Sequence, residues 1–308
     1  MRVLGIGEVL WDVFPQRELL GGAPLNFCAN TVRLGHRASL ITAVANDKRG
    51  RAALTEMADL GLDTSLVRVV SEPATGVAIV TTTPQGDHSF EIPRPAAFDE
   101  LDSSPETMQR ATAFEPDWFY FGTLLQTNAH AEQLTHDLAR KLGGVKCFYD
   151  MNLRPGCWNM PLIERLCAVA DVLKLNEFEA QTLGERIGLR SERFSLESFA
   201  AQWADSYGIE SICITLGAAG CLIYMNGNVS LVPGFPVQVE DTVGAGDAFA
   251  AAFLHGYHLR WPALQIGRFA NAVGSLVASR AGATPEWSVE ECCALASIST
   301  GEIYAAHR

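Results

Sequence analysis

The chain has 308 residues, of which 48% are hydrophobic and 19% charged, and its 27 glycines are spread along the sequence. These values predict a packed core and exclude a disulfide-stapled mini-protein, a fibrous polymer and a disordered chain. The 23 basic and 35 acidic residues give a net charge of −12, which argues against a broad surface for the phosphate backbone of DNA or RNA. Any anionic ligand must therefore be held locally.

The first strand-like run, at residues 3–7, is followed by Glu8, which interrupts the apolar stretch that a signal peptide needs. No window approaches the roughly 18 consecutive apolar residues of a membrane span. We therefore expect neither export nor a membrane partner. The eight cysteines show neither CxxC pairs nor Cys/His zinc spacing, and we interpret them as reduced, mostly buried residues of a cytoplasmic protein.

Short apolar runs bounded by glycine or polar turns recur along the chain and predict β-strands. After residues 3–7 they are 39–44, 118–122, 146–149, 172–175 and 211–216. Between several of them the apolar residues return every three or four positions, which predicts helices at 51–60, 131–142 and 196–207. Such alternation predicts a largely parallel sheet covered by helices, with ligands bound beyond the carboxyl ends of its strands.

One segment departs from this alternation. Residues 75–83 and 88–92 are β-rich runs on either side of a turn at 84–87, which predicts a β-hairpin inserted in the α/β body. Together with residues 11–20 it would form a small sheet that covers a cleft as a lid, the alternative being an antiparallel edge of the main sheet. We expect one domain over residues 1–308, with the lid built from segments 11–20 and 73–100.

The most informative segment reads DTVGAGD at residues 241–247 and follows an extended stretch around Val237 and Val239. Small residues at 244–246 let backbone N–H groups approach a ligand, and the start of the following apolar helix adds about half a positive charge. Asp247 either stabilises that helix start or acts as a general base, ionised at its ordinary pKa of about 3.9. The pattern predicts an anion hole beside a carboxylate.

DTVGAGD resembles the carboxy-terminal signature of the ribokinase-like, or PfkB, carbohydrate kinases, and GGAPLN at residues 21–26 resembles their amino-terminal one. The resemblance spans nearly the whole chain, from residues 5–8 to residues 282–285. It implies a three-layer α/β/α core with a mainly parallel sheet and a small β-lid. It also implies phosphorylation of a sugar or related hydroxyl by ATP, with Mg²⁺.

The resemblance implies roles for single residues. It places the base on Asp247 and the anion hole on Gly244, Ala245 and Gly246. It assigns contacts with the sugar to Asp12, Gly22 and Asn26. The alternative for the last two is structural, because a Gly-Gly pair also forms turns and an asparagine also caps helices.

Two further stretches carry the implied nucleotide and metal contacts. NEFE at residues 176–179 matches the N-x-x-E motif of the family, so that Asn176 lies near the nucleotide and Glu179 organises Mg²⁺ through a water molecule. A helix-capping interaction is the alternative. The resemblance assigns the remaining nucleotide contacts to a glycine turn and one later helix, namely Thr215, Gly217, Gly220 and Asn271.

Family members often hold a monovalent cation such as K⁺ beside the anion hole. The resemblance makes Asp241 and the carbonyl of Val243 its ligands here, although the sequence does not distinguish such an ion from a hydrogen bond that fixes the loop. Arg154 is the remaining catalytic candidate, since its planar guanidinium would reach a phosphate or a substrate oxygen. Its alternative is a salt bridge that anchors the loop.

The acceptor is inferred from two stretches. GEVLWD at residues 7–12 and DMNLRPGCW at residues 150–158 resemble fructokinases most, and the second also resembles 2-keto-3-deoxygluconate kinases. We therefore expect phosphorylation of a primary hydroxyl of a ketose, fructose giving fructose 6-phosphate, with 2-keto-3-deoxygluconate kinase or ribokinase as alternatives. A non-catalytic sugar or nucleotide sensor is the alternative from another class. A homodimer paired through lid strands stays open.

Overall fold

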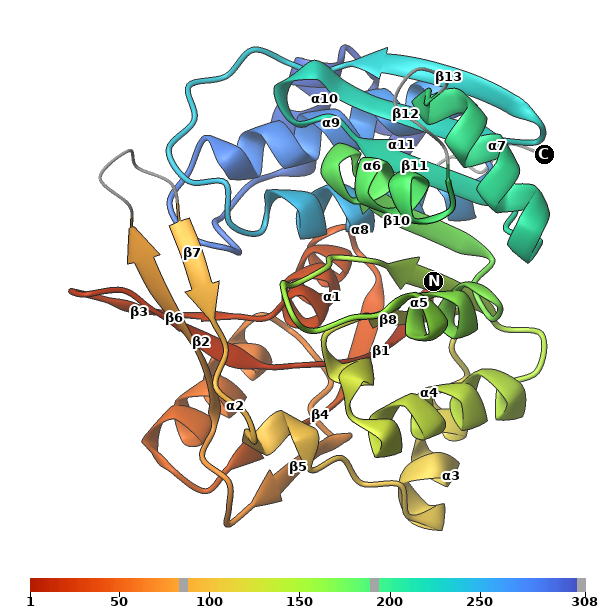
Figure 1. Cartoon of the computed structure of the whole chain (residues 1–308). Coiled ribbons are helices and arrows are strands. Elements are labelled where there is room, and N and C mark those ends of the chain that lie inside the picture. Colours follow the sequence, from red (N-terminus) through yellow and green to blue (C-terminus); the bar gives the residue numbers. More distant parts are fainter. Residues whose placement is uncertain (83–87, 189–193, 304–308) are drawn as a thin grey trace.

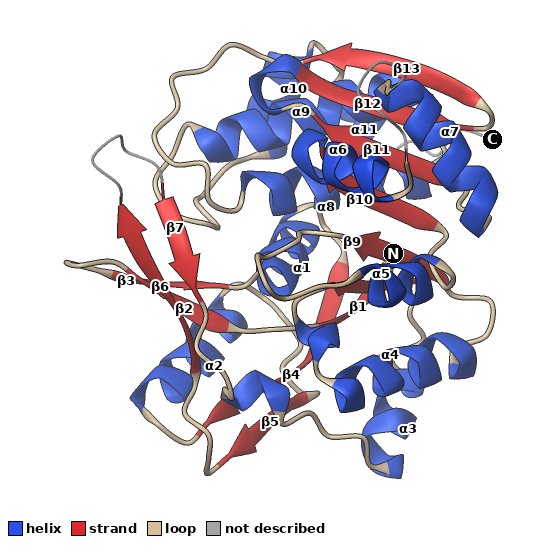
Figure 2. Cartoon of the chain, viewed as in Figure 1, coloured by secondary structure: helices blue, strands red, loops and turns tan. Residues whose placement is uncertain are grey.

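The computed structural model describes residues 1–82, 88–188 and 194–303. Nine strands form the main sheet in the order β13-β12-β11-β10-β9-β8-β1-β4-β5, which Figure 2 shows running through the middle of the molecule. The parallel strands are β1 (Arg2–Ile6), β4 (Arg37–Ala45), β5 (Val67–Val70), β8 (Trp118–Gly122), β9 (Lys146–Asp150), β10 (Val172–Asn176) and β11 (Ser211–Thr215). An antiparallel edge follows with β12 (Gly220–Met225) and β13 (Asn228–Pro233).

Helices cover both faces of this sheet and enclose two separate cores (Figure 1). One face packs against α1 (Ala23–Arg33), α2 (Lys48–Asp59), α8 (Ala245–His258), α9 (Ala263–Ala278), α10 (Val289–Ala296) and α11 (Thr300–Ile303). The other packs against α3 (Pro105–Ala113), α4 (Ala129–Lys141), α5 (Met160–Cys167), α6 (Glu177–Arg186) and α7 (Leu196–Tyr207). The predicted three-layer α/β/α core with a mainly parallel sheet is confirmed.

The central strands are apolar on both sides because helices bury both faces of the sheet. In β4, eight of nine residues are buried, and only Arg37 at its start is exposed. The six predicted strands are confirmed with small shifts at their ends, whereas β5, β12 and β13 were not predicted. All eight cysteines are free thiols and all but Cys157 are buried, as expected. No helix in the described part is long and apolar enough to cross a bilayer.

The stretch around Val237 and Val239, which precedes residues 241–247, is not part of a strand. Residues 234–243 form a loop between β13 and α8. The physical reason is local, because Pro236 lacks the N–H donor that a paired strand needs and Gly234 follows the last residue of β13.

A second sheet of four strands stands beside the main body (Figure 1), in the order β3-β2-β6-β7. Its strands are β2 (Leu10–Val13), β3 (Glu18–Gly21), β6 (Gly76–Thr82) and β7 (His88–Glu91). The predicted hairpin is confirmed by the antiparallel pairing of β6 with β7, and β2 joins β6 in parallel. The predicted turn at 84–87 lies outside the described residues. The hairpin therefore belongs to a separate sheet rather than to an edge of the main one.

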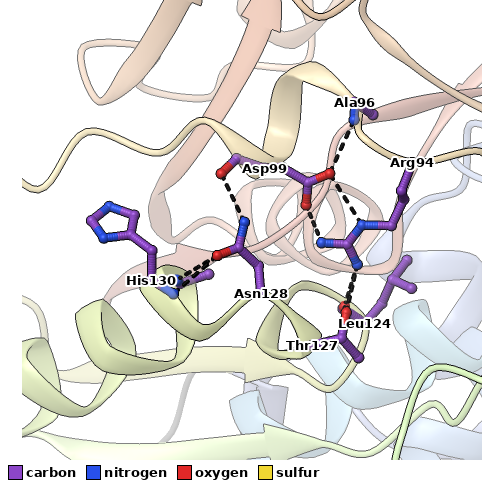
Figure 3. Close-up of polar contacts among 8 residues, drawn as sticks. Arg94, Ala96, Asp99, Leu124, Thr127, Asn128 and His130 are labelled. Atoms are coloured by element: carbon purple, nitrogen blue, oxygen red, sulfur yellow. Dashed lines mark hydrogen bonds and ion pairs between the residues drawn. The ribbon is translucent and has the colours of Figure 1, made fainter.

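Arg94, which follows β7, fastens this small sheet to the main body (Figure 3). Its guanidinium forms an ion pair with Asp99 of the short 3₁₀ turn η1 (Ala97–Asp99). It also donates to the Leu124 carbonyl at 2.9 Å and the Thr127 hydroxyl at 2.6 Å, at the turn η2 (Leu125–Thr127). The carbonyl of Asp99 in turn accepts from the Asn128 side chain, which caps α4. This network fixes where the chain leaves the small sheet.

Candidate active site

A polar cavity of about 450 Å³ lies where the two sheets meet the start of α8. The small sheet contributes Leu10, Asp12 and Ala78 to its wall, and the main sheet contributes the carboxyl ends of β10 and β11. The charged and amide side chains among its lining residues are Glu8, Asp12, Asn26, Asn152, Arg154, Lys174, Asn176 and Asp247. A parallel sheet is expected to bind its ligands at this edge.

Asp247 stands at one side of this cavity, in the first turn of α8. The helix begins after Gly244, whose φ of 77° lies in the left-handed region, and a Cβ there would lie 2.0 Å from the Ala283 carbonyl oxygen. Only glycine fits that position. Asp247 is 8% exposed, and the Asn26 side-chain amide donates to its Oδ2 at 2.8 Å. The two predicted signatures, 221 residues apart, are thus joined by a hydrogen bond.

The pKa of Asp247 in the structure differs from the ordinary value of about 3.9 expected from the sequence. Burial raises its pKa to about 6, and the charge of Asp150 acts in the same direction. Lys174, the hydrogen bond from Asn26 and Arg154 oppose this rise. Most of the carboxyl is still ionised at pH 7, and as a weaker acid it takes a proton more readily than a carboxylate with a pKa of 3.9.

The three amides predicted to form the anion hole differ in whether a protein acceptor occupies them. No acceptor occupies the N–H groups of Gly244 and Gly246 among the described residues, as expected at a helix start without a side-chain cap. Ala245 differs, because its N–H donates to the Thr242 carbonyl at 3.3 Å. Two of the three predicted amides therefore remain for an anion, and Gly244 and Gly246 both line the polar cavity.

The amino-terminal signature supplies the opposite wall. Gly22 precedes α1 with a φ of 113°, and a Cβ there would lie 2.4 Å from the Glu8 carbonyl oxygen, so the chain turns closely past Glu8. Asn26 lies within α1 and does not cap it, which excludes that alternative. Its side-chain Oδ1 is buried and has no partner in the described part of the chain. It is therefore available to a hydroxyl donor.

A second, more apolar cavity of about 500 Å³ adjoins the first, and Thr215, Thr242 and Gly246 line both. The predicted nucleotide residues Thr215, Gly217, Gly220 and Asn271 all lie on its wall. The apolar part of that wall comes mainly from Phe235, Pro236, Val237, Val239 and Phe249. The Asn271 amide donates to the carbonyls of Val232 and Pro233, both at 3.1 Å, so that nitrogen anchors α9 to β13.

The capping alternative is realised at the N-x-x-E motif. Asn176 accepts from the Glu179 N–H at 2.9 Å, and Glu179 accepts from the Asn176 N–H at 2.7 Å. The second carboxylate oxygen of Glu179 accepts from the Leu153 N–H at 2.6 Å. Glu179 is 4% exposed, and it is not among the residues that line the polar cavity, whereas Asn176 is. Glu179 therefore does not present a ligand directly to that cavity.

Asp241 is likewise bound within its loop. Its oxygens accept from the N–H groups of Val243 at 3.0 Å and Gly282 at 3.2 Å, and the Arg17 guanidinium lies 3.7 Å away. These contacts are the loop-fixing alternative to a monovalent cation. The K⁺ site at Asp241 and Val243 stays a prediction.

Sequence reasoning missed two charged residues of the site, Lys174 on β10 and its partner Asp150 on β9. Lys174 Nζ lies 3.0 Å and 3.3 Å from the two Asp150 carboxylate oxygens, and Asp150 is fully buried. Glu8 was also not selected, although it lines the cavity and burial raises its pKa to about 7. One sequence signal could have found the pair. Lys174 lies inside the apolar strand run 172–175, and a buried charge needs a partner of opposite charge nearby.

Comparisons with known proteins identify the family and the fold of the chain. The family described as "pfkB family carbohydrate kinase" matches residues 8–290. Aminoimidazole riboside kinase of Salmonella typhimurium is 29% identical over 82% of this chain and 80% of its own, and fructokinase-1 of Oryza sativa is 28% identical over 94% and 95%. A crystal structure of fructokinase with bound ATP from Xylella fastidiosa superposes with a TM-score of 0.84 at 24% identity, covering 96% of this chain and 98% of that one, which shows a shared ribokinase-like fold.

Proposed function

The chain belongs to the pfkB family of carbohydrate kinases, and on this premise we propose that it transfers the γ-phosphoryl group of ATP to a primary hydroxyl of fructose. One observation carries the proposal. Asp247 and the open Gly246 amide lie where a polar cavity suited to a sugar adjoins an apolar cavity suited to a nucleotide base. A hydroxyl on one side and a terminal phosphate on the other would meet at the same carboxylate.

The residues divide the reaction between them. Asp247 accepts the proton of the attacking hydroxyl, and the hydrogen bond from Asn26 orients its carboxylate. The N–H groups of Gly244 and Gly246, at the positive end of α8, stabilise negative charge on the phosphoryl group as it moves in line from nucleotide to sugar. Arg154 supplies further positive charge in the cavity, and the small sheet acts as the lid that excludes water.

The charges of the cavity favour a neutral acceptor. Three carboxyls, Glu8, Asp12 and Asp247, line it, and the Lys174 ammonium is paired with Asp150. Like charges would repel a sugar acid, whereas carboxylates and the free Asn26 carbonyl accept hydrogen bonds from hydroxyl groups. Arg154 is the observation that supports the second candidate, 2-keto-3-deoxygluconate, because a guanidinium pairs with a carboxylate.

The chain offers magnesium few ligands of its own. No group of three or more His, Cys, Asp or Glu side chains able to hold a metal occurs among residues 1–82, 88–188 and 194–303. The Glu179 oxygens already accept backbone N–H groups. Magnesium would accordingly be held by the nucleotide phosphates and water, as is usual for this ion, with Glu179 limited to a contact through water.

A coupled assay of ADP release with MgATP tests the proposal. The acceptors are fructose, 2-keto-3-deoxygluconate, ribose and adenosine, compared by kcat/KM because that ratio measures discrimination. We expect fructose to rank first and to give fructose 6-phosphate. The variant Arg154→Gln separates the candidates, since it would affect a sugar acid more than fructose. If none of the four acceptors supports ADP release, that result would instead support the non-catalytic sensor.

A further inference from the structure

Lys174 and Asp150 form a buried ion pair directly beneath the first turn of α8. They are neighbours across the parallel strands β10 and β9, in register with one another. Because side chains alternate along a strand, Lys174 shares a face with Val172, and Asp150 with Phe148, both of which belong to the core under α8. The pair therefore continues that core at the carboxyl ends of the strands, where the cavity opens.

Three contacts fix the pair. The Lys174 ammonium lies 3.0 Å and 3.3 Å from the Asp150 oxygens, and the Tyr120 hydroxyl donates to Asp150 Oδ2 at 3.2 Å. A Cβ placed on Gly246 would lie 3.3 Å from Lys174 Nζ. The missing side chain at Gly246 thus lets the ammonium come up against the anion hole, and Lys174 lines the polar cavity with Asp247.

Burying an ion pair in a core carries a large desolvation free energy. Desolvating two charges often costs more than their attraction returns, and apolar residues of similar volume are frequently as stable. Burial lowers the pKa of Lys174, but the charges of Asp150, Asp247 and Glu179 raise it by more, so the ammonium stays charged. A positive charge retained beside a catalytic carboxylate and an anion hole is suited to electrostatic work there.

We propose that Lys174, oriented by Asp150, is a positioning residue of the kinase that keeps Asp247 ionised and ready to accept the hydroxyl proton. The inference rests on the proposed function, since it assigns Asp247 its role as the base. Lys174 acts on Asp247 through its charge and forms no hydrogen bond with it in the described part of the chain. Asp150 acts in two ways, because it holds the ammonium in place and its own negative charge opposes ionisation of Asp247.

Other groups also change the pKa of Asp247, so they limit how far removal of Lys174 can shift it. They are Asn26 from α1, Glu8 after β1, Asp12 from β2, Tyr120 from β8, Asp150 from β9, Arg154 after β9 and Lys174 from β10. Arg154 is the other cation among them, so removal of Lys174 leaves one positive charge against the carboxyls. An opposite charge within about 4–6 Å typically lowers a carboxyl pKa by about 1–3 units.

Two nearly isosteric variants move the titration of Asp247 in opposite directions. Lys174→Met keeps the aliphatic stem and removes the positive charge, so the midpoint of the Asp247 titration should rise by about one pH unit or more. Asp150→Asn keeps the shape and removes a negative charge, so the titration should fall. A loss of packing alone would lower activity in both variants without this opposition of sign.

The titration is read by NMR of ¹³C-labelled aspartate, with Asp247→Asn to assign the signal, and in parallel from the acidic limb of kcat/KM against pH. We expect the acidic limb of Lys174→Met to shift to higher pH, with kcat/KM at pH 6 about five-fold or more below wild type. Lys146→Met, which breaks the Lys146–Glu210 ion pair at the amino end of β9, is the matched control and should change neither reading.

The two readings separate the two claims. If wild type phosphorylates no sugar but the NMR titrations move as stated, the proposed function fails and the charge coupling stands. If turnover is normal and Asp247 titrates alike in wild type, Lys174→Met and Asp150→Asn, the inference is overturned. A Lys174→Met variant that fails to fold leaves Asp150→Asn to decide by the downward shift alone.

Discussion

At the scale of single residues, Asp247 is the most consequential side chain. Asp247→Asn keeps the size and the contact with Asn26 but removes the base, so turnover should fall about 10²–10⁴-fold, or roughly 3–5 kcal/mol of barrier. The sugar KM should change much less. Steady-state kinetics with the preferred sugar measure both, and Asp205→Asn, the same change at an exposed position of α7, is the control. Near-normal turnover in Asp247→Asn would remove the base from the mechanism.

The same substitution should stabilise the fold. Burial raises the pKa of Asp247 from 3.8 to about 6, so between these values the folded state binds more protons than the unfolded state. Stability contributed by this group is therefore full below pH 3.8 and is lost as the pH rises through 6. At pH 7 the neutral amide avoids that loss, so the Tm of Asp247→Asn should exceed that of wild type. An equal or lower Tm would mean that the carboxylate is better solvated than its burial indicates.

Residue roles were predictable from sequence only where chemistry is local. The proposed base, Asp247, and the glycines where the backbone turns closely can be picked out in residues 241–247 without knowledge of the fold. Lys174 was invisible for the opposite reason, because its function depends on Asp150, a neighbour 24 residues away that only strand register brings into contact. Glu179 shows a third case, since one motif predicts both a metal contact and the helix cap that is observed.

At the scale of elements, the start of α8 depends on one glycine, and a pair of substitutions isolates why. Gly244 and Gly144 both have positive φ, at 77° and 87°, but a Cβ on Gly144 meets nothing within 4 Å. Gly144→Ala should therefore cost only the strain of the left-handed backbone, about 1–2 kcal/mol. Gly244→Ala adds a collision with the Ala283 carbonyl oxygen and must displace the loop or the helix start.

Urea unfolding and kcat together measure this difference. Gly244→Ala should lose more stability than Gly144→Ala and should also lose turnover, because the open amides and Asp247 move with the helix start. Gly144→Ala should keep wild-type kcat. Equal losses of stability and unchanged kcat in both variants would show that the helix start tolerates displacement.

Elements themselves were predicted best where burial is two-sided. The parallel strands in the middle of the sheet are continuous apolar runs, so β1, β4 and β8 to β11 could be read from composition. The edge strands β5 and β13 were missed because they are exposed and mixed in character: β13 has one buried residue, and β5 has exposed arginine and valine at its centre. The inner strand β12 was missed although four of its six residues are buried, so burial alone does not explain which strands were found. The stretch after β13 has valines, which favour a strand, but Pro236 beside them cannot donate a backbone hydrogen bond, and the stretch is a loop.

At the scale of the whole molecule, a chain of histidines links three distant parts of the sequence. The His255 ring donates from Nε2 to the Ile303 carbonyl at 2.8 Å, so its Nδ1 accepts from His36 Nε2 at 2.8 Å. His36 Nδ1 then faces the Met1 amino group at 3.2 Å. This order requires both rings to be neutral. The chain connects the starts of β1 and β4 through α8 to the end of α11.

Acid should weaken this link. Burial lowers the pKa of His36 to about 3 and that of His255 to about 4, with smaller effects from the neighbouring positive charges. The unfolded rings protonate near pH 6.5, so the contribution of the pair is full above 6.5 and is lost as the pH falls towards 4 and 3. Between pH 6.5 and 5 the loss is roughly 2 kcal/mol for each ring that stays neutral.

The buried carboxyls of the active site act in the opposite sense, so the total slope of stability against pH does not isolate the histidines. The difference in slope between variants does isolate the contribution of the histidines. His36→Gln can still donate to His255 while removing one titration, so its free energy of unfolding should fall less than that of wild type between pH 7.5 and 5 in urea melts. His130→Gln, an exposed change on α4, should keep the wild-type slope. Identical slopes for all three proteins would mean that His36 is protonated in the folded state and that the ordered chain does not form.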